Sequence, residues 1–126
     1  MQAVNWTAIG ITTMKIEDFS KNITANLQDN DKNYSFDIGL IVTIGYIIIS
    51  VIQLLMKCNV FGGKLEDRIK NPGPIDQILL RRAIKNNLPK EYYHLRDQIK
   101  DQILLNVKTL SNDEIKNMVT EAENAR

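Results

Sequence analysis

This 126-residue chain contains one thiol, that of Cys58, and one imidazole, that of His94, two groups that often serve as nucleophile, general base or metal ligand. A lone Cys can form neither an internal disulfide nor a zinc site of several thiolates. His94 has no Cys or second His with which to hold a metal ion, and nothing pairs with it as a catalytic dyad. We therefore expect no catalytic residue, no metal site, no cofactor and no enzymatic activity.

Covalent modification is the chemistry that the sequence favours instead. N-x-S/T sequons begin at Asn5, Asn22 and Asn33, and all three precede a long apolar segment. Such sequons accept N-linked glycans in secreted and membrane proteins, so we expect a glycoprotein of a eukaryotic membrane, with Asn33 the least accessible site because it lies nearest the bilayer. Cys58 follows the apolar segment, where a thiol is placed for S-palmitoylation; an unmodified thiol is the alternative.

The apolar segment has the length and composition of a membrane span. Residues 38–56 contain no charged side chain, and twelve of these nineteen residues are Ile, Leu or Val. Nineteen helical residues extend about 28 Å, close to the hydrocarbon thickness of about 30 Å. The twelve aliphatic residues favour insertion by about 4–7 kcal/mol. The alternative is the core helix of a soluble protein, but a chain this short offers little material to cover it on all sides, so we predict a transmembrane helix.

The charges on either side of the span predict its orientation. The first 37 residues carry three basic and five acidic side chains, whereas Lys57, Lys64, Arg68 and Lys70 follow the span closely. Basic residues stay on the cytoplasmic side, so the amino end is expected outside or in a lumen and the carboxyl end in the cytoplasm. The predicted divisions are an outer segment at 1–37, the span at 38–56, a juxtamembrane linker at 57–74 and a cytoplasmic region at 75–126.

A stripe of small and polar residues runs along the predicted span. Its members are separated by 4, 3, 4 and 3 residues, and they are Gly39, Thr43, Tyr46, Ser50 and Gln53. This heptad spacing keeps one side of a helix facing a partner helix. In lipid, small residues allow close approach and polar side chains form hydrogen bonds between helices, so the polar stripe predicts a homo-oligomer. A pore lined by the same residues is the alternative to packing alone, with Gln53 at its narrowest point.

The two ends of the chain are expected to differ in order. The outer segment is predicted to be short and poorly ordered, with one short amphipathic helix over 16–27. Its mildly apolar stretch, residues 3–14, is predicted to be loosely structured, and a membrane-surface or fusion-peptide role is the alternative. The cytoplasmic region is predicted to form about three amphipathic helices. The first has an apolar face and ends before Pro89, the second follows Pro89, and the third opens with the capping box Ser111–Glu114. Their predicted apolar faces comprise, in turn, Ile75, Ile78, Leu79 and Ile84; Tyr92, Leu95, Ile99, Ile103, Val107 and Leu110; and Ile115, Met118, Val119 and Ala122.

The predicted fold class is thus all-α, with one span and a small helical region after it. The net charge of +1 excludes a nucleic-acid binder that relies on overall positive charge. The expected partners are the lipid bilayer, further copies of the chain, and a cytoplasmic protein bound through residues 75–124.

This layout resembles the small single-span viral membrane proteins of viroporin type, including the proton channels of influenza-like viruses. The resemblance is one of architecture over residues 5–70: sequons before the span, a polar stripe within it, and the Lys57–Cys58 junction after it. The span lacks the His followed four residues later by Trp that those channels use, and it carries no titratable acid, so a weakly selective pore in a host membrane is what the resemblance implies. An assembly or adaptor protein tethered by the span, and a small viral fusion protein, are the alternatives.

Overall fold

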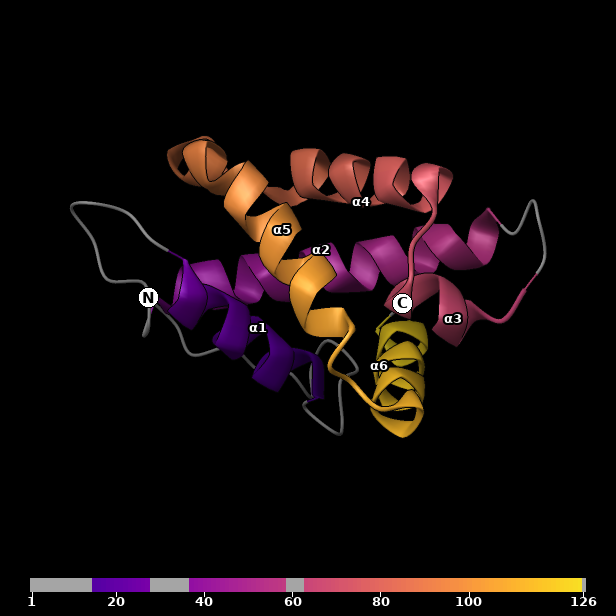
Figure 1. The fold of residues 1–126 in the computed structure, drawn as a ribbon. Helices are drawn as coiled ribbons and strands as arrows, with labels where there is room; N and C mark the ends of the chain where they lie inside the picture. The colour runs from indigo at the N-terminus through magenta and orange to yellow at the C-terminus, as the bar shows by residue number, and fades with distance from the viewer. Residues whose placement is uncertain (1–14, 28–36, 59–62, 126) are drawn as a thin grey trace.

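Helices make up the regular structure of the described chain, which in this computed structural model comprises residues 15–27, 37–58 and 63–125 (Figure 1). The elements in chain order are α1 (Lys15–Asn26), α2 (Ile38–Lys57), α3 (Leu65–Lys70), α4 (Pro74–Asn87), the 3-10 helix η1 (Lys90–Leu95), α5 (Arg96–Val107) and α6 (Asn112–Asn124). The predicted all-α class is confirmed for these residues. Asn5, Asn33 and the apolar stretch 3–14 lie outside them.

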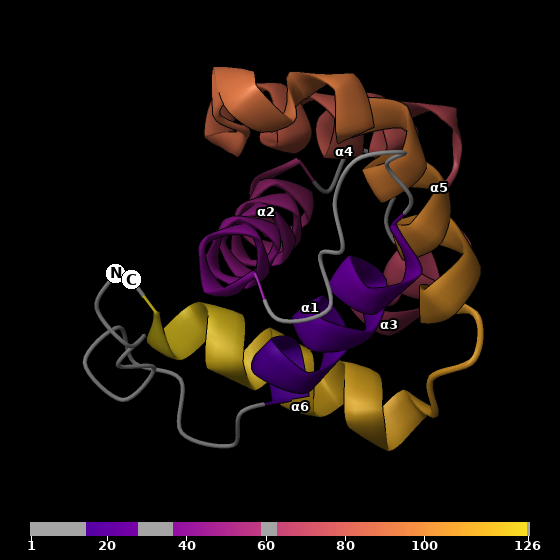
Figure 2. The ribbon, with the colours of Figure 1, turned by 90° about the vertical axis from the view of Figure 1, so that its left-hand side faces the viewer.

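The central element is α2, which coincides with the predicted span. Its first turn is capped by Asp37, whose Oδ1 accepts a hydrogen bond from the Leu40 backbone N–H at 3.1 Å. The uncharged, Ile-rich sequence then continues without a proline as far as Lys57. Figure 2 views α2 close to its axis, with α4 above it and α1, α5 and α6 below and to one side. Among the described helices, α2 alone is long and apolar enough to cross a membrane.

Most of the apolar surface of α2 is covered by other helices of the same chain. Nine of its residues are buried, and they are Leu40, Ile41, Ile44, Gly45, Ile47, Ile48, Ile49, Ile52 and Leu55. The expectation that so short a chain cannot cover this helix is therefore wrong for its apolar faces. The physical reason is that α1, α4 and α6 each turn one apolar stripe toward α2, so that three short amphipathic helices share a single central helix as their core.

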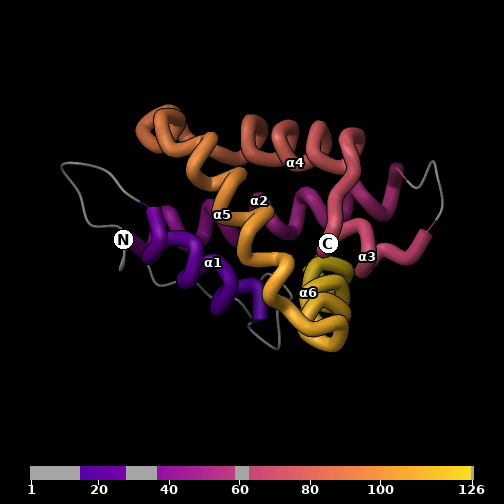
Figure 3. Tube along the Cα trace, in the orientation of Figure 1, coloured from indigo at the N-terminus to yellow at the C-terminus, as the bar shows by residue number. Residues whose placement is uncertain are grey.

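The outer segment contributes a packed helix. The predicted amphipathic helix over 16–27 is confirmed as α1, whose Ile16, Phe19 and Ile23 are buried. It lies against α2 and α6 along the molecule, as the trace in Figure 3 shows. Over residues 15–27 the expectation of poor order is wrong, because α1 docks on α2, the predicted span, and on α6, which was predicted to lie on the other side of a membrane.

Two polar contacts join α1 to α6. Lys15 Nζ lies 3.3 Å from Glu114 Oε2, and the backbone N–H of Ile16 donates to Oε1 of the fully buried Glu121 at 3.3 Å. A carboxylate at the first turn of a helix is favourable, because the free N–H groups and the helix dipole carry partial positive charge there. The start of α1 is therefore held by the side chain of a residue 105 positions later in the chain.

The three helices predicted for residues 75–126 are present, but the inward face of the first, α4, was predicted only in part. The capping box is present, with Ser111 Oγ accepting from the Glu114 N–H at 3.1 Å and Glu114 Oε1 accepting from the Ser111 N–H at 3.0 Å. The hydrogen bond from the Ser111 backbone, followed by that from Lys15, lowers the pKa of Glu114. The predicted inward residues of α5 and α6 are buried or half-buried.

The face predicted for α4 is partly wrong. Ile75 and Ile78 are 41% and 55% exposed, whereas Leu79, Leu80, Ala83 and Ile84 are buried. Apolar residues lie on several sides of this helix, so periodicity alone does not decide which side turns inward. The predicted second helix also differs in form, because its first six residues adopt the tighter 3-10 conformation of η1 before α5 begins.

The compact fold differs from the predicted single-span arrangement. Helix α1 precedes α2 and α6 follows it, yet α1 and α6 are in direct contact. Two segments that touch cannot lie on opposite sides of a bilayer that α2 crosses. The described conformation is therefore one in which other helices of the chain, rather than lipid, cover α2.

Candidate functional site

The polar stripe is the side of α2 that the other described helices leave least covered. Tyr46 is 42% exposed, and Gly39, Thr43, Ser50 and Gln53 are half-buried. The heptad spacing thus corresponds to a real surface, one that faces away from the protein core.

Polar side chains of the stripe use hydrogen bonds within the fold. Thr43 Oγ1 donates to the Gly39 carbonyl at 2.9 Å, as hydroxyls inside apolar helices commonly do. Ser50 Oγ accepts from Asn87 Nδ2 at 3.1 Å, and Gln53 Nε2 donates to the Ala122 carbonyl at 3.1 Å. The carboxyl half of the stripe therefore connects α2 to the ends of α4 and α6.

An open polar hollow lies where the stripe meets the end of α4. It has a volume of about 240 Å³ and is lined by Ser50, Gln53, Leu54, Lys57, Ala83, Asn86 and Asn87. Its polar groups are hydroxyl, amide and one ammonium. Such a surface supports hydrogen bonding to a polar partner, and it contains no carboxylate, imidazole or thiol for acid–base or nucleophilic chemistry.

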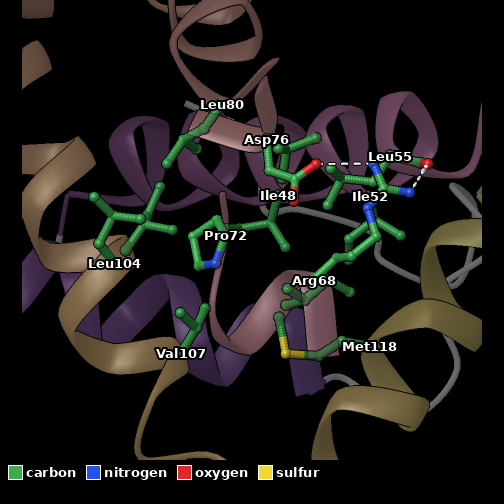
Figure 4. Close-up of a pocket in the computed structure, with 13 residues that line it drawn as sticks. Ile48, Ile52, Leu55, Arg68, Pro72, Asp76, Leu80, Leu104, Val107 and Met118 are labelled. Carbon is green, nitrogen blue, oxygen red and sulfur yellow. Dashed lines mark hydrogen bonds and ion pairs between the residues drawn. The ribbon is translucent and has the colours of Figure 1, made fainter. Parts of the chain in front are cut away.

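Arg68 holds the carboxyl end of α2. Its guanidinium donates to the Leu55 carbonyl at 2.9 Å and to the Cys58 carbonyl at 3.0 Å, two of the oxygens that a helix end leaves without an intrahelical partner. The same group pairs with Asp76 Oδ1 at 2.8 Å, while Asp76 Oδ2 accepts from the Gly73 N–H at the start of α4. One arginine thus joins α2, α3 and α4, an arrangement visible in Figure 4.

The cavity beside Arg68 is too small for an organic ligand. It holds about 30 Å³, room for one or two water molecules. Apart from Arg68 and Asp76, its walls are apolar and come from α2 to α6, including Ile48, Leu80, Leu104 and Met118 (Figure 4). We interpret it as a packing defect of the core next to the ion pair.

The amino end of α2 has its own polar contact. Tyr92 in η1 donates its hydroxyl hydrogen to Asp37 Oδ2 at 2.9 Å, while Asp37 Oδ1 caps α2. Both ends of the apolar helix are therefore fixed by hydrogen bonds, the carboxyl end to Arg68 of α3 and the amino end, through Asp37, to Tyr92 of η1.

The predicted modification sites are only partly described. Asn22 is exposed on α1, whereas the Thr24 of its sequon is fully buried and donates to the Ser20 carbonyl at 2.8 Å. Cys58 is a half-buried free thiol at the C-cap of α2. His94 is exposed in η1, and the described ranges bring together no three His, Cys, Asp or Glu side chains that fit a metal ion.

The contacts of Arg68 were not predicted from the sequence, in which Arg68 is one of several basic residues that follow the apolar segment. A local signal existed in the Asp76 and Gly73 that follow it, but the contacts to Leu55 and Cys58 depend on how the chain folds back. Neither a protein-family model, nor a curated protein, nor a solved structure significantly matches this chain.

Proposed function

We propose that this protein inserts α2 into lipid bilayers and that the compact fold stores the helix before insertion. The observation that carries the proposal is the contrast within α2. It has the length and uncharged composition of a span, yet its apolar faces are covered by amphipathic helices of its own chain. Amphipathic helices are suited to this exchange, because each can leave α2 and lay its apolar stripe on the membrane surface.

The free energy gained by inserting α2 into a bilayer is similar in size to the free energy of unfolding of the compact fold. Insertion of the twelve aliphatic residues is favourable by about 4–7 kcal/mol, and a domain of this size is stable by about 5–15 kcal/mol. The stored form therefore persists in water, and insertion requires that α1 separate from α6 while membrane contact compensates for the lost packing. After insertion, the amino end is proposed to lie outside or in a lumen and the carboxyl end in the cytoplasm.

The inserted helix is proposed to self-associate along the polar stripe and to permeabilise the membrane weakly. In lipid, the stripe residues lose their contacts with α4 and α6, and equivalent groups of another copy replace them. Leu at Gly39, Thr43, Tyr46, Ser50 and Gln53 is expected to convert detergent-solubilised oligomers to monomers in chemical crosslinking. Unchanged oligomers would show that the stripe is not the interface.

The decisive experiment places charges where the stored fold tolerates them and a bilayer does not. Thr43 and Tyr46 lie on the uncovered side of α2, so Thr43→Lys with Tyr46→Lys is expected to leave the thermal unfolding temperature nearly unchanged. Two lysines near the middle of a span cost about 5–7 kcal/mol, which cancels the gain from the aliphatic residues. We expect the unmodified protein to resist alkaline carbonate extraction and to release dye from vesicles, and the variant to be extracted and to release at least tenfold less.

The matched control adds the same charges elsewhere. Ile78→Lys with Leu105→Lys alters two exposed residues of α4 and α5 and should insert like the unmodified protein. Carbonate extraction of the unmodified protein, or equal insertion of the Thr43→Lys, Tyr46→Lys variant, would overturn the proposal.

A second candidate, an adaptor in which α2 remains a core helix, is favoured by one specific observation. The polar stripe already faces outward and is hydrogen-bonded through Ser50 and Gln53, as the water-facing side of a core helix is. Under this hypothesis, a protein partner binds the outer surface of residues 75–124, where Ile78 and Leu105 are exposed. Lysines at those two positions would then abolish partner binding and leave vesicles intact. The fusion alternative rests on residues 3–14, outside the described ranges.

A further inference from the structure

A second open hollow lies between α4 and the start of α5. Its volume is about 220 Å³, and Arg81 and Lys85 from α4 line it together with Tyr93, Arg96 and Lys100 from η1 and α5. Ile84 and Asp97 complete the lining. We call this the basic hollow. No residue of α2 contributes to it.

The charges around the basic hollow are unbalanced. Four cations face one carboxylate, and in the described part of the chain the ion pairs involve other residues, so none of the four is neutralised by a salt bridge. Arg81 and Lys85 are four residues apart on one helix, and Arg96 and Lys100 are four apart on another. Like charges at this spacing destabilise a helix. The fold thus carries two repulsive pairs on opposite walls of the same hollow.

The wider sequence shows the same concentration of charge. Residues 77–100 contain six Lys or Arg and two Asp or Glu, although the whole chain has a net charge of only +1. The first turns of α1 and α6 are acidic. The small net charge therefore masks a local excess of basic residues, and such a local excess can bind an anion although the chain as a whole is nearly neutral.

One of the cations is already held in position. The Arg96 guanidinium lies 4.6 Å from the centre of the Tyr93 ring and donates to the Tyr93 carbonyl at 3.1 Å. A stacked guanidinium keeps further N–H groups free for a ligand, and arginine matches the oxygens of a phosphate with two parallel hydrogen bonds. The arrangement reduces the entropy that Arg96 would lose when it binds an anion.

We propose that the basic hollow binds a phosphate group. Arg81 and Arg96 donate to its oxygens from opposite walls, and Lys85 and Lys100 supply two more positive charges. Ile84 and the exposed edge of Tyr93 give the organic part of the ligand an apolar contact. The phosphate belongs either to the headgroup of an anionic lipid or to a soluble phosphate compound. The proposal does not rest on the insertion of α2, because no residue of α2 lines the hollow.

Calorimetric titration of the full chain with pyrophosphate tests the soluble source. Arg81→Gln with Lys100→Gln removes one cation from each wall and is expected to weaken binding about 10–100-fold, since the variant loses the charge-assisted hydrogen bond from Arg81 and the positive charge of Lys100. Arg82→Gln with Lys108→Gln removes the same charge at exposed positions outside the hollow and should change affinity less than about twofold. The Arg81→Gln, Lys100→Gln variant should unfold at the same or a higher temperature, because it loses two like-charge contacts.

Vesicles test the lipid source. Binding to phosphatidylcholine vesicles that contain phosphatidic acid should exceed binding to pure phosphatidylcholine, and the Arg81→Gln, Lys100→Gln variant should lose that excess while keeping its dye release from pure phosphatidylcholine. Binding of pyrophosphate would indicate a soluble phosphate ligand. Additional binding to vesicles that contain phosphatidic acid, with no binding of pyrophosphate, would indicate a lipid headgroup. The proposal is overturned by the absence of both, or by equal losses in the control variant. Failure of α2 insertion would instead remove dye release and leave pyrophosphate binding unchanged.

Discussion

Replacing Arg68 with alanine is expected to lower the free energy of unfolding by about 3 kcal/mol. Removing one partner of a buried ion pair typically costs about 3–5 kcal/mol, and the lower value applies because the Arg68 and Asp76 side chains remain 15% and 12% exposed. The substitution leaves Asp76 without its cation and the carbonyls of Leu55 and Cys58 without their donor. Urea denaturation followed by circular dichroism gives the difference directly.

Two control variants separate the contacts of Arg68 from its charge. Arg68→Lys keeps the charge and cannot reach both carbonyls and Asp76 together, so we expect an intermediate loss. Lys64→Ala removes an exposed cation just before α3 and should change stability by less than about 0.5 kcal/mol. A loss below about 1 kcal/mol in Arg68→Ala would contradict the assignment of Arg68 as the residue that secures the end of α2.

Joining Lys15 to Glu114 covalently is expected to reduce dye release from vesicles at least tenfold. The ammonium and carboxylate are 3.3 Å apart, so a zero-length carbodiimide can convert the ion pair to an amide. The new bond ties α1 to α6, and these two helices cannot then lie on opposite sides of a membrane crossed by α2. The measurement is dye release by the purified, crosslinked monomer compared with the untreated protein.

The chain offers a matched control for this experiment. In Lys15→Gln the link to α6 cannot form, whereas Lys21 and Glu17, 3.7 Å apart within α1, remain available to the reagent. Carbodiimide treatment of this variant should leave dye release unchanged. Full release by the linked protein would show that the membrane activity does not require the compact fold to open.

Features fixed by neighbouring residues were predictable from the sequence. The absence of charge over residues 38–56 predicts α2 to within one residue, Pro89 ends the first predicted helix, and the Ser111–Glu114 capping box marks the start of α6. Each rests on a rule that acts over one or two helical turns. The amphipathic pattern of α1 belongs to the same group.

Features that depend on distant parts of the chain were not predictable. Hydropathy measures the preference of α2 for apolar surroundings, and it does not distinguish lipid from Ile16, Leu80 or Met118 of the same chain. The contact of α1 with α6 and the position of Arg68 both depend on whether α2 is surrounded by lipid or by other helices of the chain. The polar stripe illustrates the ambiguity, because one row of small and polar residues fits a helix interface in lipid and a water-facing edge equally well.

The burial of Thr24 decides in which state of the protein Asn22 can be glycosylated. A glycan transferase must reach the hydroxyl of the sequon, and in the docked helix that group is fully buried and bonded to the Ser20 carbonyl. Sugar attachment at Asn22 is therefore expected only while α1 is undocked, either before the compact fold is complete or in the proposed inserted state. A sugar chain found on this asparagine would show that the segment entered the secretory lumen with α1 undocked.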